Sequence, residues 1–148
     1  MPLTRFIRHL LQLMVRPLDR EEGLMLLKCG VLPIDEEAVS AFEQYTYVWD
    51  LTGFSLRKPF TRSPSGFSER EMSERDAEKL ALAESARKVL VGCWDRFRED
   101  LQALEEKTEE LVRQMGRGLL EGKIAPDPQS TGARLPCSWC EYKSVCGK

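Results

Sequence analysis

Helical spacing of apolar residues is the feature that most restricts the fold of this chain. After Asp76, apolar side chains recur at intervals of three, four and seven residues, at Leu80, Ala83, Leu90, Trp94, Phe97, Leu101 and Leu104. This spacing places them on one face of an α-helix. Ser73, three residues before Asp76, fits the first position of a capping box. The pattern predicts one long helix that begins near Ser73 and ends at about Leu104.

Two shorter helices are predicted near the N-terminus. Apolar residues three and four apart indicate an amphipathic helix over Leu3–Arg16, which Pro17 ends. Asp19 is a suitable N-cap for a second helix over Glu21–Cys29. Gly30 can take the left-handed conformation that closes this second helix.

A third helix, capped by Asp35, is expected to carry the most aromatic face of the chain. Its apolar positions are Val39, Phe42, Tyr45 (or Thr46) and Trp49. Gly53 lies just beyond the last of them. The following stretch, Thr52–Ser73, contains two prolines and two glycines and shows no sustained period. We expect it to be a long, loosely ordered surface loop.

A second helical run is predicted over Thr108–Glu121, stopped by Gly122. We expect five of its residues to point inward: Leu111, Val112, Met115, Leu119 and Leu120. From Lys123 onward, three prolines leave no room for a helix longer than two turns. Because no strand pattern is convincing either, the predicted fold class is mainly α, with an irregular, cysteine-rich C-terminal tail.

Three of the five cysteines gather in that tail, with the spacing C-x2-C-x5-C at Cys137, Cys140 and Cys146. Three soft ligands this close favour iron–sulfur or zinc chemistry. Metal sites usually have four protein ligands. Cys93 is the nearest further thiol, although beside Trp94 it is more typical of a core residue. The alternative is that the three tail cysteines bind nothing.

Charge gives only a local indication of a nucleic-acid partner. The net charge is −2, so no global basic field exists. From Leu111 onward, six basic residues against three acidic ones give a local charge of +3. A metal-organised tip with Arg134, Trp139 and Lys143 would suit a phosphate backbone or a stacked base. Ordinary solubility explains the same charges.

No catalytic residues are predicted. The stretch GRGLLEGKI lacks the first glycine, the hydroxyl residue and the preceding strand of a phosphate-binding loop. Glu141-Tyr142-Lys143 imitates the acid-x-lysine part of a metal-dependent nuclease, but no upstream carboxylate on a sheet accompanies it. No apolar run approaches the roughly 20 residues that cross a bilayer. Without a signal peptide or a disulfide pattern, we expect a cytoplasmic protein with no membrane partner.

The C-terminal stretch GKIAPDPQSTGARLPCSWCEYKSVCGK resembles the end of the B subunit of AddAB-type ATP-dependent helicase–nucleases, which belong to the PD-(D/E)XK nucleases. There, a G-x-I-x-P-x-P stretch leads into the last three cysteines of a 4Fe–4S cluster. Upstream, Lys28-Cys29-Gly30-Val31 and Glu43-Gln44-Tyr45 stand where the helicase-like half of that subunit has its K-T-G-L and E-N-Y segments.

The resemblance implies two regions: a helicase-like helical segment over 1–102, containing the loop 52–73, and the C-terminal end of a nuclease domain over 103–148. The nuclease core that lies between them in the family is missing, together with the catalytic residues, the phosphate loop and the first cluster cysteine. The chain therefore looks like a truncated or internally deleted relative. Carried across, Cys137, Cys140 and Cys146 would be three of four cluster ligands.

The resemblance implies DNA ends and a helicase–nuclease partner subunit as partners, in the repair and recombination of double-strand breaks. In the family, the cluster ties the C-terminus to the nuclease domain and supports the binding of duplex ends without performing cleavage. The alternative is a small interaction module in which the three tail cysteines and either Cys93 or His9 hold zinc as a structural clip.

Overall fold

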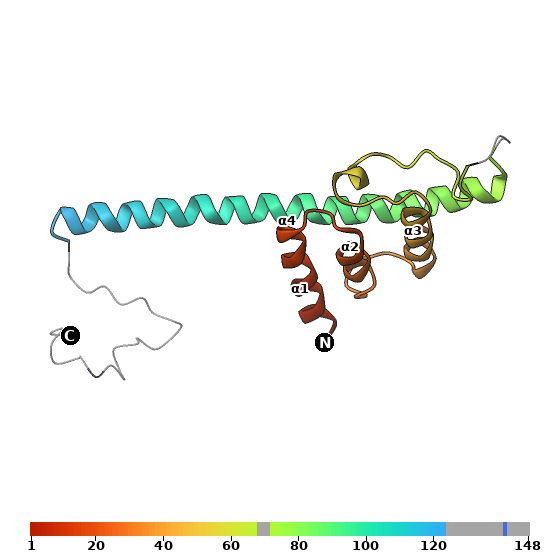
Figure 1. Cartoon of the computed structure of the whole chain (residues 1–148). Helices are drawn as coiled ribbons and strands as arrows, with labels where there is room; N and C mark the ends of the chain where they lie inside the picture. Colours follow the sequence, from red (N-terminus) through yellow and green to blue (C-terminus); the bar gives the residue numbers. More distant parts are fainter. Residues whose placement is uncertain (68–71, 124–140, 142–148) are drawn as a thin grey trace. The chain divides into compact units, whose positions relative to one another are not determined.

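The computed structural model describes residues 1–67, 72–123 and 141. The chain divides into two units, Met1–Gln102 and Ala103–Lys148. The helices are α1 (Pro2–Val15), α2 (Arg20–Leu27), α3 (Glu36–Val48), the 3-10 helix η1 (Gly53–Arg57) and α4 (Glu74–Leu120) (Figure 1). Because no strand occurs among the described residues, the mainly α prediction is confirmed.

Short-range signals fix where the helices begin and end. The Glu22 backbone N–H donates to Asp19 Oδ1 at 3.2 Å and caps α2 as expected. Beyond α2, Gly30 has a φ of +69°, the left-handed conformation that glycine adopts without strain. The Asp76 N–H donates to Ser73 Oγ at 3.2 Å before α4. The first part of the predicted capping box is therefore present.

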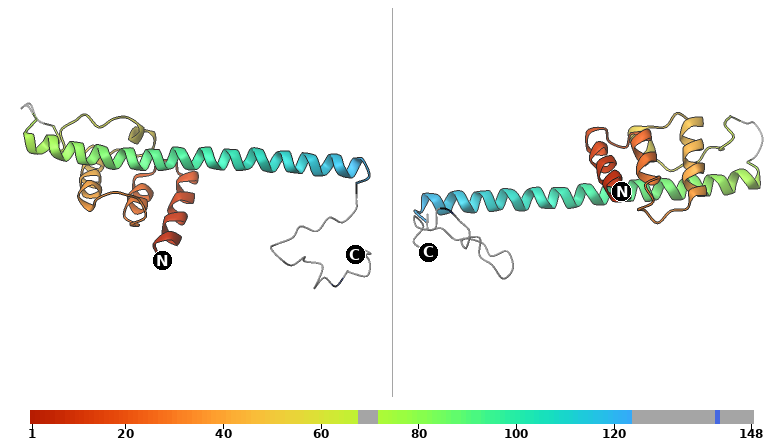
Figure 2. Two further views of the ribbon diagram at one scale, coloured as in Figure 1. Left: turned by 180° about the vertical axis from the view of Figure 1, so that it is seen from behind. Right: turned by 90° about the horizontal axis from the view of Figure 1, so that it is seen from below.

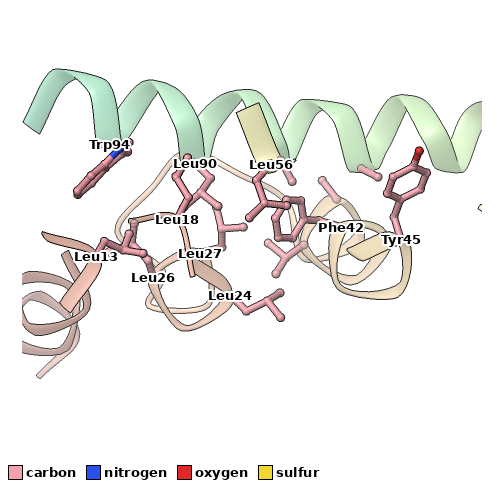
Figure 3. Packing of buried hydrophobic residues seen from close by; sticks show 14 of the residues in the cluster. Leu13, Leu18, Leu24, Leu26, Leu27, Phe42, Tyr45, Leu56, Leu90 and Trp94 are labelled. Atoms are coloured by element: carbon pink, nitrogen blue, oxygen red, sulfur yellow. The ribbon is translucent and has the colours of Figure 1, made fainter. Parts of the chain in front are cut away.

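The core of the first unit lies between α4 and the three shorter helices. Figure 2 shows from two further directions that α1, α2 and α3 follow one another along α4. The buried α4 residues Ala83, Ala86, Leu90 and Trp94 share one helical face. Figure 3 shows this cluster extending along the helix from Trp94 to Tyr45. At Gly23 of α2, an added Cβ would meet Leu90 Cδ2 at 2.9 Å, so α2 approaches α4 closely.

The loop between α3 and α4 is packed rather than loosely ordered. Leu56 of η1 and Phe60 are buried, and the Phe60 ring stacks on Tyr45 with centroids 4.2 Å apart. Arg87 of α4 donates to the backbone carbonyl oxygens of Leu56 and Arg57. Residues 53–67 do form a surface loop, but the expected loose order was wrong, because partners distant in the sequence hold this segment.

The expected break between two helices after Leu104 does not exist, because α4 continues without interruption to Leu120. The charged run after Leu104 contains neither proline nor glycine, and its glutamates and lysine are good helix formers. The Thr108 hydroxyl donates to the Leu104 carbonyl oxygen at 2.7 Å, within the helix. Gly122, with a φ of +76°, follows the helix end as predicted.

The apolar residues expected to point inward from the last turns of α4 are exposed. The exposed fractions are 50% for Leu111, 62% for Val112, 69% for Met115, 63% for Leu119 and 91% for Leu120. Helical spacing shows which residues share a face of a helix, but it does not show whether another element covers that face.

None of the helices in the described ranges combines the length and the hydropathy of a membrane-spanning segment.

Two leucines of α4 should therefore respond differently to truncation. Leu90→Ala should lower the free energy of unfolding by about 2–5 kcal/mol, because it leaves a cavity in the core. Leu111→Ala, the matched change at an exposed position of the same helix, should change it by less than about 0.5 kcal/mol. Urea unfolding followed by circular dichroism measures both. Equal costs would show that the face around Leu111 is covered in solution.

Candidate functional site

The residues predicted to bind a cluster and DNA lie outside the described part of the chain. They are Cys137, Cys140 and Cys146 for the metal, and Arg134, Trp139 and Lys143 for DNA. Glu141 is the described residue of that stretch, and it is exposed. These six assignments stay predictions.

Cys93, the candidate fourth ligand, lies on α4 within the first unit and is partly buried. Burial raises the pKa of its thiol. Cys29 is also engaged, because its thiol donates to the Met25 carbonyl oxygen at 3.0 Å.

His9, the other residue considered for a zinc clip, joins two helices instead. Its Nδ1 lies 2.7 Å from Glu22 Oε2, which connects α1 to α2. Among the described residues, no group of three or more His, Cys, Asp or Glu side chains could hold a metal ion.

The acid-x-lysine spacing also occurs at the end of α4, in Glu121-Gly122-Lys123. Lys123 Nζ lies 2.7 Å from Glu121 Oε2, and both side chains are exposed. A metal-dependent nuclease site needs further carboxylates that bind the cation beside such a pair. Since the described residues contain no cluster of this kind, we read Glu121 and Lys123 as a surface ion pair.

The two upstream segments that resemble the helicase-like half meet in space. Lys28 Nζ lies 2.6 Å from Glu43 Oε2, although fifteen residues separate them in the sequence. Both line a pocket of about 350 Å³ whose other walls include Leu27, Gly30 and Val39. Sequence reasoning singled out the segments but did not predict their contact.

A second pocket, which sequence reasoning missed, lies where the loop after η1 passes the end of α3. This loop pocket has a volume of about 270 Å³ and is lined by Tyr45, Trp49, Leu51, Ser55, Lys58, Pro59, Phe60, Thr61 and Arg62. Two of the lining residues are basic and none is acidic. The sequence feature that could have indicated this pocket is a loop stretch that contains three basic residues, Arg57, Lys58 and Arg62, and no acidic residue.

Hydrogen bonds and ring contacts fix the aromatic wall of the loop pocket. The Trp49 indole N–H donates to the Ser63 carbonyl oxygen at 3.0 Å, and the Arg62 N–H donates to the Tyr45 hydroxyl oxygen at 3.0 Å. The Arg62 guanidinium lies over the Trp49 ring, 4.7 Å from its centroid. Phe67 meets the same ring edge-on at 4.8 Å. The pocket therefore combines cationic groups with oriented aromatic rings.

Comparison with known proteins identifies one family. The model of the PD-(D/E)XK nuclease superfamily matches residues 37–147, which is most of the chain and includes the three tail cysteines. The matched range begins in α3, within the segment that we likened to the helicase half. No curated protein and no solved structure matches the chain.

Proposed function

Because the chain belongs to the PD-(D/E)XK nuclease superfamily, we propose that it is a fragment-like relative of a helicase–nuclease subunit. In this role it acts in the cytoplasm on DNA ends during double-strand break repair and recombination, together with a partner subunit. It binds a 4Fe–4S cluster that supports binding to those ends. It has no intact nuclease or ATPase site of its own.

The observation that carries this proposal is the extent of the family match. The match ends at residue 147 and so includes Cys137, Cys140 and Cys146 at its C-terminal end. Three cysteines within ten residues form a donor set of the type that iron–sulfur clusters use.

The donor chemistry fits a cluster better than it fits a catalytic metal. Cysteine thiolates are soft ligands that select iron–sulfur clusters or zinc, whereas nuclease cations prefer carboxylate oxygens. Cys137, Cys140 and Cys146 would hold the cluster, which would supply a structural cross-link rather than cleavage chemistry. The three tail cysteines carry the proposal without Cys93, which is partly buried and packs against the core of the first unit.

DNA-end binding without cleavage tests the proposal. Full-length protein, purified without oxygen, should bind a labelled blunt duplex in a fluorescence anisotropy assay. A closed circular competitor should displace it poorly, because the circle has no ends. Incubation with magnesium or manganese should leave the duplex intact on a denaturing gel. Equal competition by circular and linear DNA, or cleavage that co-purifies with the chain, would contradict the proposal.

A further inference from the structure

We propose that the loop pocket, together with the neighbouring Phe67, binds single-stranded nucleic acid. The inference extends the proposed DNA-binding role to a surface of the first unit that contains none of the tail residues. It does not depend on the cysteine cluster.

The charges around the loop pocket leave two cations available for phosphate groups. Asp95 accepts two hydrogen bonds from Arg57, at 2.8 and 2.9 Å. Glu84 is held in the same way by Arg87, with two bonds of 2.6 Å. Within the described ranges, no carboxylate forms an ion pair with Lys58 or Arg62, and both are exposed.

A third acidic residue, Asp76, also has hydrogen-bond partners. Asp76 accepts hydrogen bonds from the Ser65 and Ser73 hydroxyls, at 2.8 and 2.9 Å. These bonds lower the pKa of its carboxyl group, the Ser65 bond being the larger cause. The two hydroxyl groups hold the Asp76 side chain between the loop and the start of α4. Among the residues that line the loop pocket, the charged side chains are Lys58 and Arg62, and both are basic.

Stacking surfaces distinguish this site from a general anion site. Phe67 is 95% exposed, which is unusual for a large aromatic side chain that also contacts another ring. Nucleobases stack on exposed aromatic rings and on guanidinium planes. The Phe67 ring offers the first kind of surface, and the Arg62 guanidinium over Trp49 offers the second. A lipid headgroup or a phosphopeptide would use the two cations but not these planar surfaces.

The size of the pocket favours a single strand over a duplex. Its volume of about 270 Å³ lies just below the roughly 300–1,000 Å³ of typical ligand pockets. A space of this size admits one base or one sugar–phosphate group. Bases are available for such insertion only where they are unpaired, so the strand must be single at this point.

Fluorescence anisotropy with labelled oligo-dT tests the inference on the full chain. Lys58→Ala/Arg62→Ala should weaken binding and reduce the slope of log affinity against log salt by about 1.4, since each neutralised phosphate of a single strand contributes about 0.7. Phe67→Ala should weaken binding about tenfold, because one stacking contact is lost. All three side chains are exposed, so circular dichroism should show an unchanged fold.

Two control variants make the outcome specific. Arg5→Ala/Arg8→Ala removes the same charge from exposed positions of α1 and should bind oligo-dT as wild type does. Cys140→Ala should also retain oligo-dT binding, even if it loses the blunt duplex. The inference would be overturned if the α1 variant weakened oligo-dT binding as much as the loop-pocket variants do. It would also be overturned if the loop-pocket variants bound oligo-dT as wild type does, or if only Cys140→Ala lost this binding. Wild-type protein that binds oligo-dT but does not bind the blunt duplex would count against the proposed function alone.

Discussion

Arg87→Ala should lower the free energy of unfolding by about 3 kcal/mol, among the largest effects expected of a single substitution in this chain. Arg87 is only 7% exposed. Its guanidinium makes two hydrogen bonds to Glu84 and two to the carbonyl oxygens of Leu56 and Arg57. Alanine would leave a partly buried carboxylate and two loop carbonyls without this partner. Urea unfolding measures the loss.

A second arginine provides the matched control for this prediction. Arg57 also donates two hydrogen bonds to a carboxylate, that of Asp95, but this pair is exposed to solvent. Arg57→Ala should cost no more than about 1 kcal/mol, as is usual for a surface ion pair. If both variants lost the same stability, burial of the Arg87 network would not be the source of its effect.

The Arg87 network also predicts a dependence on pH. The Arg87 hydrogen bonds, opposed by burial and aided by the Phe60 N–H, hold the pKa of Glu84 below its ordinary value of 4.5. A carboxyl group with a lowered pKa in the folded state stabilises the fold above its unfolded pKa. That contribution should be lost as the pH falls from about 4.5 through the lowered pKa. In Arg87→Ala, the acid-induced loss of stability should be smaller over the same range.

Cys140→Ala should remove bound iron from the protein while leaving its helix content close to that of wild type. Loss of one thiolate from a three-cysteine set leaves too few ligands for the cluster. The core of the first unit is formed by residues between Phe6 and Phe97, so we expect its helices to fold without the cluster. Metal analysis and circular dichroism on the same sample measure both effects. Retention of iron, or collapse of the helices together with its loss, would contradict this expectation.

Cys93→Ala is the companion variant, because it tests the candidate fourth ligand. Cys93 is partly buried and packs against the core of the first unit, so we expect this variant to keep its full iron content. Loss of metal equal to that in Cys140→Ala would identify Cys93 as a ligand despite its surroundings.

Features fixed by neighbouring residues could be predicted from the sequence. The cap at Asp19 and the left-handed glycines at positions 30 and 122 depend on residues within one turn, and each lies where the sequence placed it. The break expected after Leu104 was wrong for a physical reason. The apolar spacing lapses in the charged run, but helix continuity depends on backbone propensity, which that run satisfies.

Features that depend on distant partners could not be predicted in this way. The packing of the loop after α3 requires Arg87, which lies thirty residues from its Arg57 partner. Likewise, Trp49 contacts Arg62 in the loop pocket and Phe67 beside it, and no local sequence pattern predicts these contacts. For the tail, residue type and spacing suggest ligands for a metal, but they do not distinguish iron–sulfur from zinc.

The metal content of the full chain tests the central claim most directly. Protein purified without oxygen should be assayed for iron, acid-labile sulfide and zinc, and its visible spectrum recorded. We predict about four irons and four sulfides per chain, the composition of a 4Fe–4S cluster, with broad visible absorbance. One zinc per chain and a colourless solution would contradict the claim and favour a structural clip. Protein without any metal would contradict it as well.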